Sequence, residues 1–313
     1  MPQEPLKHVI EAQQLTVDLM EEEIFPLADK MKDVVEIGGS HVLSGKRMVA
    51  LFYEPSTRTR ASFEIAMNML GGTVVFSTEN AREFSSAAKG ETLRDTILVL
   101  NRYHPHVIVI RHHVTDSVKT VSEISSVPII NAGDGRGQHP TQALLDLYTI
   151  KKRFGNVNGL TVAMVGDLKN GRTIRSLSYL LAKYTGVKIC FVAPNSLRVG
   201  DDIKDYLTRH KVSWQELYDL REVAHNMDVV YMTRTQKERG SVIDPNDKGF
   251  FIVDSLVLGL MKRESIIMHP LPRNDEISLE VDSDPRAVYL TEQVSAGLYT
   301  RMALLFMVIR PNP

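Results

Sequence analysis

Hydroxyl and guanidinium groups are concentrated at positions 56–60, where the sequence reads S-T-R-T-R. The segment follows an apolar run at 47–53 and leads directly into a helical pattern. Free N–H groups at a helix N-terminus, together with Ser, Thr and Arg donors, can bind phosphate without a glycine-rich loop. Alternatively, Ser56 or Thr57 is an ordinary N-cap and the two arginines are solvated. The spacing therefore predicts either a phosphate site or a plain helix start.

Further polar segments follow other predicted strands. Ligands of open parallel sheets bind outside the carboxyl ends of the strands, so chemistry is expected there. Each segment also has an ordinary interpretation, because loop lysines and charge runs are usually solvated. The segments comprise the 78–90 loop with Ser85 and Lys89, a strand end at Arg111, His139 and Gln142 on one face of a helix start, the 166–173 run with Arg172, the pair Arg234 and Gln236, and the 269–273 run.

The residue types in these segments limit the chemistry. The 166–173 run resembles a P-loop but has arginine where that motif requires lysine, which disfavours an ATPase. Adjacent His112 and His113 invite a metal interpretation, but neighbours in a strand point to opposite faces, which argues against it. Pro270 and Pro272 fix a turn and leave main-chain carbonyls as acceptors. Cations, hydroxyls and carbonyls without paired carboxylates predict a small polyanionic ligand.

These segments need strands and helices to position them. Short β-branched runs alternate with helical patterns along nearly the whole chain, which is typical of parallel sheets covered by helices. The pattern predicts strands at about 47–53, 73–77, 106–111, 127–132, 160–166, 187–193, 228–233 and 265–268. It predicts helices at about 57–70, 91–102, 116–125, 140–153, 173–184, 201–210 and 291–309.

Length and composition fit that fold class. A chain of 313 residues favours two domains, so we expect two doubly wound parallel-sheet α/β domains with the active site in the crevice between them. The formal net charge of −1 gives no basic field for nucleic acid, and no apolar run is long enough to cross a membrane. The single cysteine, Cys190, excludes an internal disulfide and fits a cytoplasmic location.

Six motifs, taken together and in order, resemble the carbamoyltransferase family and its aspartate branch. The match covers essentially the whole chain. It implies transfer of the carbamoyl group of carbamoyl phosphate to L-aspartate, giving N-carbamoyl-L-aspartate and phosphate in pyrimidine biosynthesis, with no cofactor and no metal. The motifs are S-T-R-T-R, K-G-E-T, H-P-T-Q, G-D-L-K-N-G-R-T, M-T-R-T-Q-K-E-R and H-P-L-P-R.

The resemblance also implies roles for individual residues. The residues implied to bind carbamoyl phosphate are Ser56, Thr57, Arg58, Thr59, Arg111, His139, Gln142, Leu271 through its carbonyl, and Pro272. Among them Arg58, Thr59, Arg111 and His139 are the implied catalytic residues, while Gln142 and the Leu271 carbonyl receive the carbamoyl amino group. Those implied to bind aspartate are Lys89, Arg172, Arg234 and Gln236, and Ser85 and Lys89 are implied to come from a neighbouring subunit of a homotrimer with shared active sites.

The family pattern further implies domain bounds and partners. Residues 1–150 with the C-terminal helix 291–313 are expected to form the carbamoyl phosphate-binding domain, and 151–290 the aspartate-binding domain. Glu54 is implied to hold the domains closed through arginines such as Arg172 and Arg234. Regulatory subunits or fused pyrimidine-pathway domains are the other partners that the family allows.

Two alternatives stay open. An ornithine or other amino-acid carbamoyltransferase shares the first half of the motifs. Ornithine carries an ammonium group that needs acidic partners, however, and the second half is basic at Arg172, Arg234, Lys237 and Arg239; ornithine-using relatives also have cysteine where this chain has Pro270. The other alternative is a non-catalytic relative, which would bind substrate without turnover.

Overall fold

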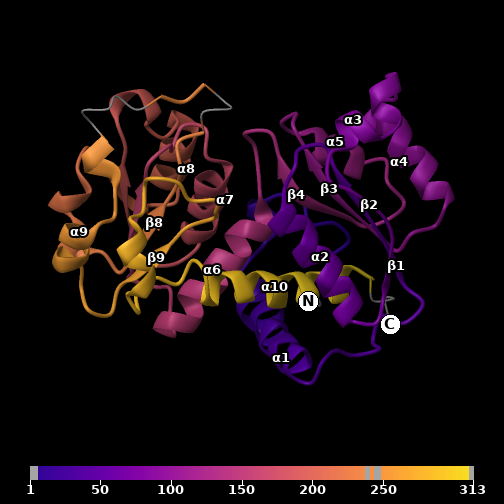
Figure 1. Ribbon diagram of the computed structural model, residues 1–313, viewed down its shortest axis with the longest axis horizontal. Coiled ribbons are helices and arrows are strands. Elements are labelled where there is room, and N and C mark those ends of the chain that lie inside the picture. Colours follow the sequence, from indigo (N-terminus) through magenta and orange to yellow (C-terminus); the bar gives the residue numbers. More distant parts are fainter. Residues whose placement is uncertain (1–5, 237–239, 243–247, 310–313) are drawn as a thin grey trace. The chain divides into compact units, whose positions relative to one another are not determined.

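The computed structural model describes residues 6–236, 240–242 and 248–309, and it divides the chain into two compact units (Figure 1). The first unit comprises Met1–Leu145 and Ala296–Pro313, and the second comprises Asp146–Ser295. Lys237 and Arg239, two of the basic residues that disfavour ornithine as a substrate, lie outside the described residues. No helix in the described part of the chain has the length and apolarity needed to span a bilayer.

A four-stranded parallel sheet forms the centre of the first unit, in the order β2-β1-β3-β4. The inner strands are buried nearly throughout because they are runs of Val, Ile, Leu and Met with helices on both faces. Ile97 of α4 and Val118 of α5 pack on the face that carries Leu51 and Ile108. The strands are β1 (Arg47–Phe52), β2 (Thr73–Thr78), β3 (Val107–His112) and β4 (Ile129–Asp134).

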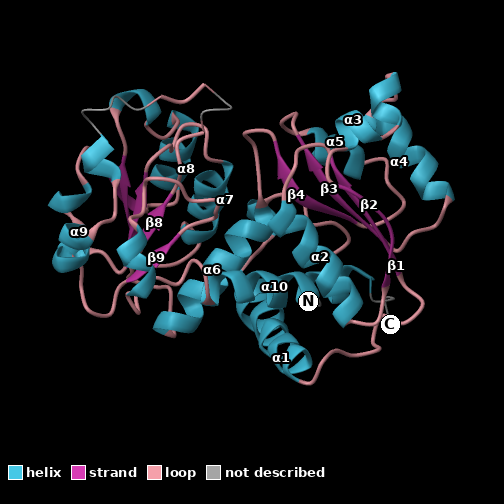
Figure 2. Cartoon of the chain, viewed as in Figure 1, coloured by secondary structure: helices cyan, strands magenta, loops and turns pink. Residues whose placement is uncertain are grey.

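Helices connect and cover these strands, as Figure 2 shows. Two long helices, α6 and α10, each begin in one unit and end in the other, so the first unit is built from two separate stretches of sequence. The helices are η1 (Ala12–Gln14), the π-helical η2 (Leu19–Ile24), α1 (Phe25–Glu36), α2 (Thr57–Met69), α3 (Ala81–Phe84), η3 (Ser86–Lys89), α4 (Leu93–Arg102), α5 (Ser117–Ser122), α6 (Pro140–Phe154) and α10 (Glu292–Ile309).

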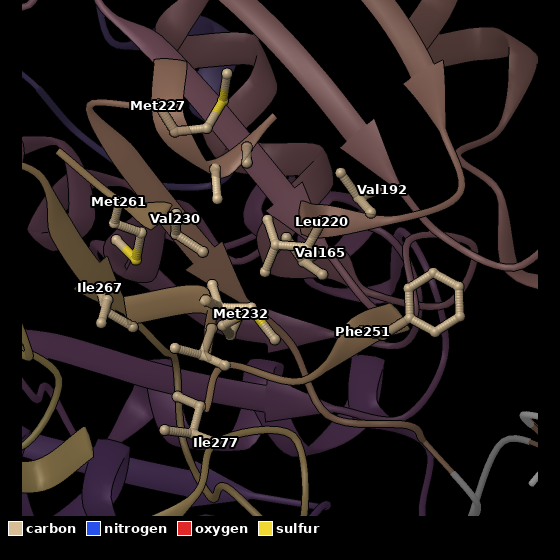
Figure 3. Close-up of a cluster of buried hydrophobic side chains, with 14 of the residues drawn as sticks. Val165, Val192, Leu220, Met227, Val230, Met232, Phe251, Met261, Ile267 and Ile277 are labelled. Carbon is tan, nitrogen blue, oxygen red and sulfur yellow. The ribbon is translucent and has the colours of Figure 1, made fainter. Parts of the chain in front are cut away.

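The second unit contains a five-stranded parallel sheet in the order β7-β6-β5-β8-β9. Its core includes Val165, Met232, Phe251 and Ile267, whose side chains gather on one side of the sheet (Figure 3). The strands are β5 (Thr161–Val165), β6 (Lys188–Val192), β7 (Ser213–Leu217), β8 (Val229–Met232) and β9 (Ile266–Met268), and the helices are α7 (Arg172–Leu181), η4 (Asn195–Leu197), α8 (Asp201–Arg209), η5 (Leu220–Glu222), η6 (Ala224–Asn226), η8 (Lys248–Phe251), α9 (Ser255–Leu260) and η9 (Leu279–Ser283).

Strand order reverses next to the first strand of each sheet. β1 pairs with β2 on one side and β3 on the other, and β5 pairs with β6 and β8 in the same way. This is the doubly wound arrangement, in which ligands bind beyond the carboxyl ends of the strands at the reversal. The predicted α/β class with two parallel sheets is confirmed. The edge strand β7 and helix α1 were not predicted.

Candidate active site

Arg111 lies at the strand-order reversal of the first sheet. The Tyr53 N–H donates to the Arg111 carbonyl at 2.8 Å, so β1 and β3 stay paired to their ends. The Arg111 Nε atom lies 3.5 Å from Oε2 of Glu54, and its Nη1 donates to the Ala132 carbonyl at 3.4 Å. These contacts tie the guanidinium to the ends of three neighbouring strands, where a fixed positive charge can face an anion.

The S-T-R-T-R segment forms the start of α2. Ser56 occupies the N-cap position, but its side chain makes no capping hydrogen bond. The Thr57 hydroxyl donates to Oε1 of Glu79 at 3.2 Å, Arg58 is exposed, and Thr59 is buried. The first turn therefore presents main-chain N–H groups and a positive dipole end, which are features that can bind phosphate.

Arg60 does not fit the alternative in which it is simply solvated. Its Nε lies 2.5 Å from Oε2 of Glu79, and its Nη1 lies 3.4 Å from Oε1 of Glu64. Nη1 also donates to the Ser77 hydroxyl at 3.3 Å. Arg60 thus connects α2 to the end of β2 and stabilises the segment that precedes the 78–90 loop.

His139 is placed by a tight turn after β4. The Asp134 carboxylate accepts hydrogen bonds from the Gln138 N–H at 2.6 Å and the Asp116 N–H at 3.0 Å. Gly135 has φ +44°, and a Cβ there would lie 2.6 Å from the Thr115 nitrogen, so the turn requires glycine. The buried His139 follows, and its carbonyl accepts from the Gln142 N–H at 3.1 Å at the start of α6.

The two adjacent histidines do not point to opposite faces, so that expectation was wrong. Their rings stack with centroids 4.4 Å apart, because β3 ends at His112 and His113 already belongs to the following turn. The His112 Nδ1 atom accepts from the Val114 N–H at 3.1 Å. Among the described residues, no group of three or more His, Cys, Asp or Glu side chains could hold a metal ion.

Ser85 lies between the two short helical segments that follow β2, and Lys89 lies at the end of the second one. The Ser85 hydroxyl donates to the Ala81 carbonyl at 2.5 Å and accepts from the Ala87 N–H at 3.1 Å, so it stabilises the fold of this loop. Lys89 ends η3 and is exposed, and the neighbouring Phe84 is 77% exposed. The loop therefore presents a cation and an aromatic ring on its surface.

A buried carboxylate, Asp167, organises the reversal point of the second sheet. Its Oδ2 accepts the Gln236 N–H at 3.1 Å and the Ser241 hydroxyl, and its Oδ1 accepts the Asn170 N–H at 3.1 Å. The loop after β5 is thereby bonded to the segment after β8, which carries Arg234. Asp167 and Ser241 were missed by the sequence analysis, because only the folded chain brings them together.

Close main-chain contact between β5 and β8 supports this arrangement. Gly166 has φ +108°, and a Cβ there would lie 2.2 Å from the Thr233 carbonyl oxygen, so the approach requires glycine. Arg172 begins α7 and is 5% exposed. The Arg234 Nη1 donates to the Thr235 carbonyl at 3.4 Å. The two arginines thus follow neighbouring strands, where guanidinium groups can bind carboxylates.

Leu271 and Pro272 follow the neighbouring strand β9, and the peptide bond between them is cis. The candidate ligand-binding residues form two sets, each within one unit. The first-unit set is Ser56, Thr57, Arg58, Thr59, Arg111, His139 and Gln142; the second-unit set is Arg172, Arg234, Gln236, Leu271 and Pro272. The first set offers hydroxyl and cationic donors for a phosphate, and the second offers guanidinium groups for carboxylates.

Comparisons with known proteins agree with this division. The family model of the aspartate/ornithine carbamoyltransferase carbamoyl-P binding domain matches residues 7–152, and that of the Asp/Orn binding domain matches residues 158–308. Aspartate carbamoyltransferase 3, chloroplastic, of Pisum sativum is 54% identical over 308 residues, covering 97% of this chain and 78% of the relative. Multifunctional protein ura1 of Schizosaccharomyces pombe is 46% identical, over 97% of this chain and 13% of the relative.

The chain is also similar to solved structures of aspartate transcarbamoylase. Trypanosoma cruzi aspartate transcarbamoylase in complex with N-(phosphonacetyl)-L-aspartic acid has a TM-score of 0.91 and 40% identity, covering 96% of this chain and 95% of that one. The same enzyme in complex with carbamoyl aspartate and phosphate has a TM-score of 0.88 and 39% identity, with the same coverage.

Proposed function

Since the chain belongs to the aspartate/ornithine carbamoyltransferase family, we propose that its two sets of residues bind the two substrates, with the phosphate held by the first set and aspartate by the second. The activity is that of an aspartate carbamoyltransferase of pyrimidine biosynthesis, which makes N-carbamoyl-L-aspartate and phosphate. The first-unit set binds carbamoyl phosphate, and Arg172, Arg234 and Gln236 of the second-unit set bind aspartate. One observation carries this division: each set lies at the carboxyl ends of the two strands where strand order reverses and of the strand beside them, β1, β3 and β4 in one sheet and β5, β8 and β9 in the other.

The proposed mechanism is a direct transfer. The neutral amine of aspartate attacks the carbonyl carbon, a C–N bond forms, and the carbonyl oxygen becomes an oxyanion that Thr59, Arg111 and His139 stabilise. The C–O bond to phosphate then breaks, and the departing phosphate, held by Ser56 and Arg58, takes the amine proton. Positive charge that meets developing negative charge lowers the barrier more than it stabilises the bound substrates.

Orientation of the two substrates also contributes to the rate enhancement. Bringing two reactants into the right geometry contributes about 7 to 11 kcal/mol, so the mechanism requires both substrates to be bound next to each other. Gln142 and the Leu271 carbonyl accept from the carbamoyl amide group, which distinguishes this substrate from other acyl phosphates. We further propose that Glu54 stabilises the substrate-bound form through arginines.

We also propose a homotrimer in which Ser85 and Lys89 of one subunit complete the site of the next. Exposed apolar side chains support this proposal: Phe84 is 77% exposed, and on the edge strand β2 Val75 is 50% and Phe76 45% exposed. An apolar edge strand of this kind is typical of a surface that pairs with another chain. A second copy would bury these side chains and bring Lys89 close to the anion site.

A cytoplasmic location is proposed on the single buried thiol, Cys190, which fits a reducing compartment. The Pisum sativum relative is named chloroplastic. Imaging of the full chain fused to a fluorescent protein tests the location, and accumulation in a plastid would contradict it.

Product analysis tests the proposed function. The purified chain is incubated with carbamoyl phosphate and an equimolar mixture of L-aspartate and L-ornithine, and the products are identified by mass spectrometry. We expect N-carbamoyl-L-aspartate without citrulline, because arginines bind a dicarboxylate and repel an ammonium group. Formation of citrulline at a comparable rate would contradict the assignment of Arg172 and Arg234.

A further inference from the structure

The imidazole of His269 connects the end of strand β9 to the turn at Leu271. Its side chain is fully buried. Its Nδ1 accepts a hydrogen bond from the main-chain N–H of Leu271 at 2.7 Å, and its Nε2 lies 2.8 Å from Oε1 of Glu276. Neither His269 nor Glu276 belongs to the second-unit set. Together they nevertheless hold the main chain of a residue that does.

These contacts fix the tautomer of His269. An Nδ1 atom that accepts from an N–H carries no proton, so the ring proton is on Nε2 and is donated to Glu276. The same Glu276 oxygen accepts from the Asn274 N–H at 3.0 Å. Burial alone would raise the pKa of Glu276, but the hydrogen bond from His269 and those from main-chain N–H groups outweigh it and lower the pKa. The carboxylate is therefore ionised at neutral pH and can only accept.

Glu276 is itself well anchored. Its carbonyl accepts from the Val253 N–H at 3.0 Å, and Ile277 forms a parallel bridge with Val253. On the other side, the His269 N–H donates to Oε1 of Gln293 at 3.0 Å. The imidazole is thus held between two fixed points and cannot turn without breaking its hydrogen bonds to Leu271 and Glu276.

Leu271 needs this support, because its φ is +56°. The left-handed region is unfavourable for a non-glycine residue and persists only where the surroundings impose it. Rotation about the N–Cα bond of Leu271 changes the direction of its carbonyl. The hydrogen bond from the Leu271 N–H to His269 fixes the peptide plane that precedes Leu271, and together with the observed φ it restrains the direction of that carbonyl.

We propose that Glu276 is a positioning residue, which fixes the tautomer of His269 and so holds the Leu271 carbonyl in place to accept from the amide group of carbamoyl phosphate. The inference rests on the proposed function, which assigns this carbonyl to that amide group. It has a consequence for specificity: acetyl phosphate has a methyl group where carbamoyl phosphate has an amide, so it gains nothing from the positioned carbonyl.

Ligand binding to the full chain tests the proposal. Without Glu276 the ring proton can move to Nδ1, where it would oppose the Leu271 N–H. We expect Glu276→Ala to weaken carbamoyl phosphate binding about tenfold, the effect of losing one hydrogen bond between the Leu271 carbonyl and the amide group, and acetyl phosphate binding less than twofold. Glu276→Gln is the conservative variant, because its amide oxygen can still accept from His269 and Asn274; it should stay within about threefold of the parent for both ligands.

The outcomes separate this inference from the proposed function. If the parent enzyme does not prefer carbamoyl phosphate to acetyl phosphate, the assignment of the Leu271 carbonyl is wrong. If the parent does prefer it and Glu276→Ala weakens both ligands equally, or neither, the positioning role of Glu276 is overturned and the assignment stands.

A spectroscopic measurement decides the tautomer even if the alanine variant folds poorly. The ¹⁵N chemical shifts of the parent's imidazoles distinguish the two neutral tautomers from imidazolium, and the signal missing from His269→Gln identifies His269. We expect the Nε2–H tautomer at neutral pH. An Nδ1–H tautomer or an imidazolium would overturn the inference.

Discussion

The main-chain N–H of Gln236 donates a hydrogen bond to Oδ2 of the fully buried Asp167 at 3.1 Å. The same carboxylate accepts from Ser241 and Asn170, so Asp167→Ala would leave several buried donors unsatisfied. We expect a loss of about 3 kcal/mol in the unfolding free energy of the second unit, together with a higher KM for aspartate. Urea denaturation and initial rates measure both, and Asp205→Ala, an exposed position on α8, should change neither.

Arg58→Ala should lower the turnover rate by a much larger factor than it lowers the affinity for aspartate. Its guanidinium is proposed to meet charge that develops on the departing phosphate, and loss of one such contact raises the barrier by about 3 to 4 kcal/mol. Steady-state kinetics provide the measurement, and Arg102→Ala, an exposed arginine at the end of α4, is the matched control. An Arg58→Ala enzyme that keeps more than about a tenth of the parent turnover would rule out this role.

Arg234→Ala should raise the KM for aspartate steeply, because a guanidinium group matches a carboxylate. Binding of carbamoyl phosphate, measured separately by calorimetry, should change little. Arg209→Ala, at the last turn of α8, removes an exposed arginine of the same unit and serves as the control. If Arg234→Ala weakens the binding of both substrates equally, the division of binding between the two sets is refuted.

Mixing two inactive variants tests the shared site. Arg58→Ala and Lys89→Ala subunits should each be nearly inactive alone. In a ring with heterologous contacts, equal mixing and reassembly should leave about a quarter of the sites with both residues intact, so activity should reappear. Native mass spectrometry must show mixed trimers; if these form without recovered activity, Lys89 does not act in a neighbouring subunit's site.

Stability should fall below neutral pH partly because of His112. Burial, and then the neighbouring His113, lower the pKa of His112 to about 4. Between pH 6.5 and 4 the unfolded chain therefore binds a proton there that the folded chain does not, and unfolding is favoured by on the order of 2 kcal/mol at the acid end. Denaturation at pH 7.5 and 5 should show a weaker pH dependence in His112→Gln than in the parent, whereas His210→Gln, at an exposed ring, should behave like the parent.

Strong local patterns allowed most of the fold to be predicted. Strands such as β3 are continuous apolar runs, which occur where helices cover both faces of a parallel sheet. β7 was missed because Ser213–Leu217 is an edge strand with Gln215 and Glu216 at its centre, and exposed edges need no apolar run. His113 was misplaced because the alternation rule holds only within a strand.

The site was predicted less completely, for a physical reason. The segments that carry the candidate ligand-binding residues can be recognised in the sequence by their residue types. The residues that hold those segments in place cannot be recognised in this way. Ser241 contacts Asp167 across 74 positions of sequence, and nothing near either residue marks the pair. Glu276 is recognisable only from the direction in which the His269 ring points. The roles assigned to the sequence-predicted site residues stay predictions until the variants above are measured.

Helix α10 has a consequence for synthesis on the ribosome. Its buried side chains, among them Met302 and Leu305, belong to the first unit, and Arg301 lies over the Phe63 ring of α2 at 5.3 Å. The first unit begins to be translated first but is completed last. Residues 6–145 must remain without their final helix while the entire second unit is synthesised. The second unit can fold during translation, whereas the first unit is completed only after α10 has been translated.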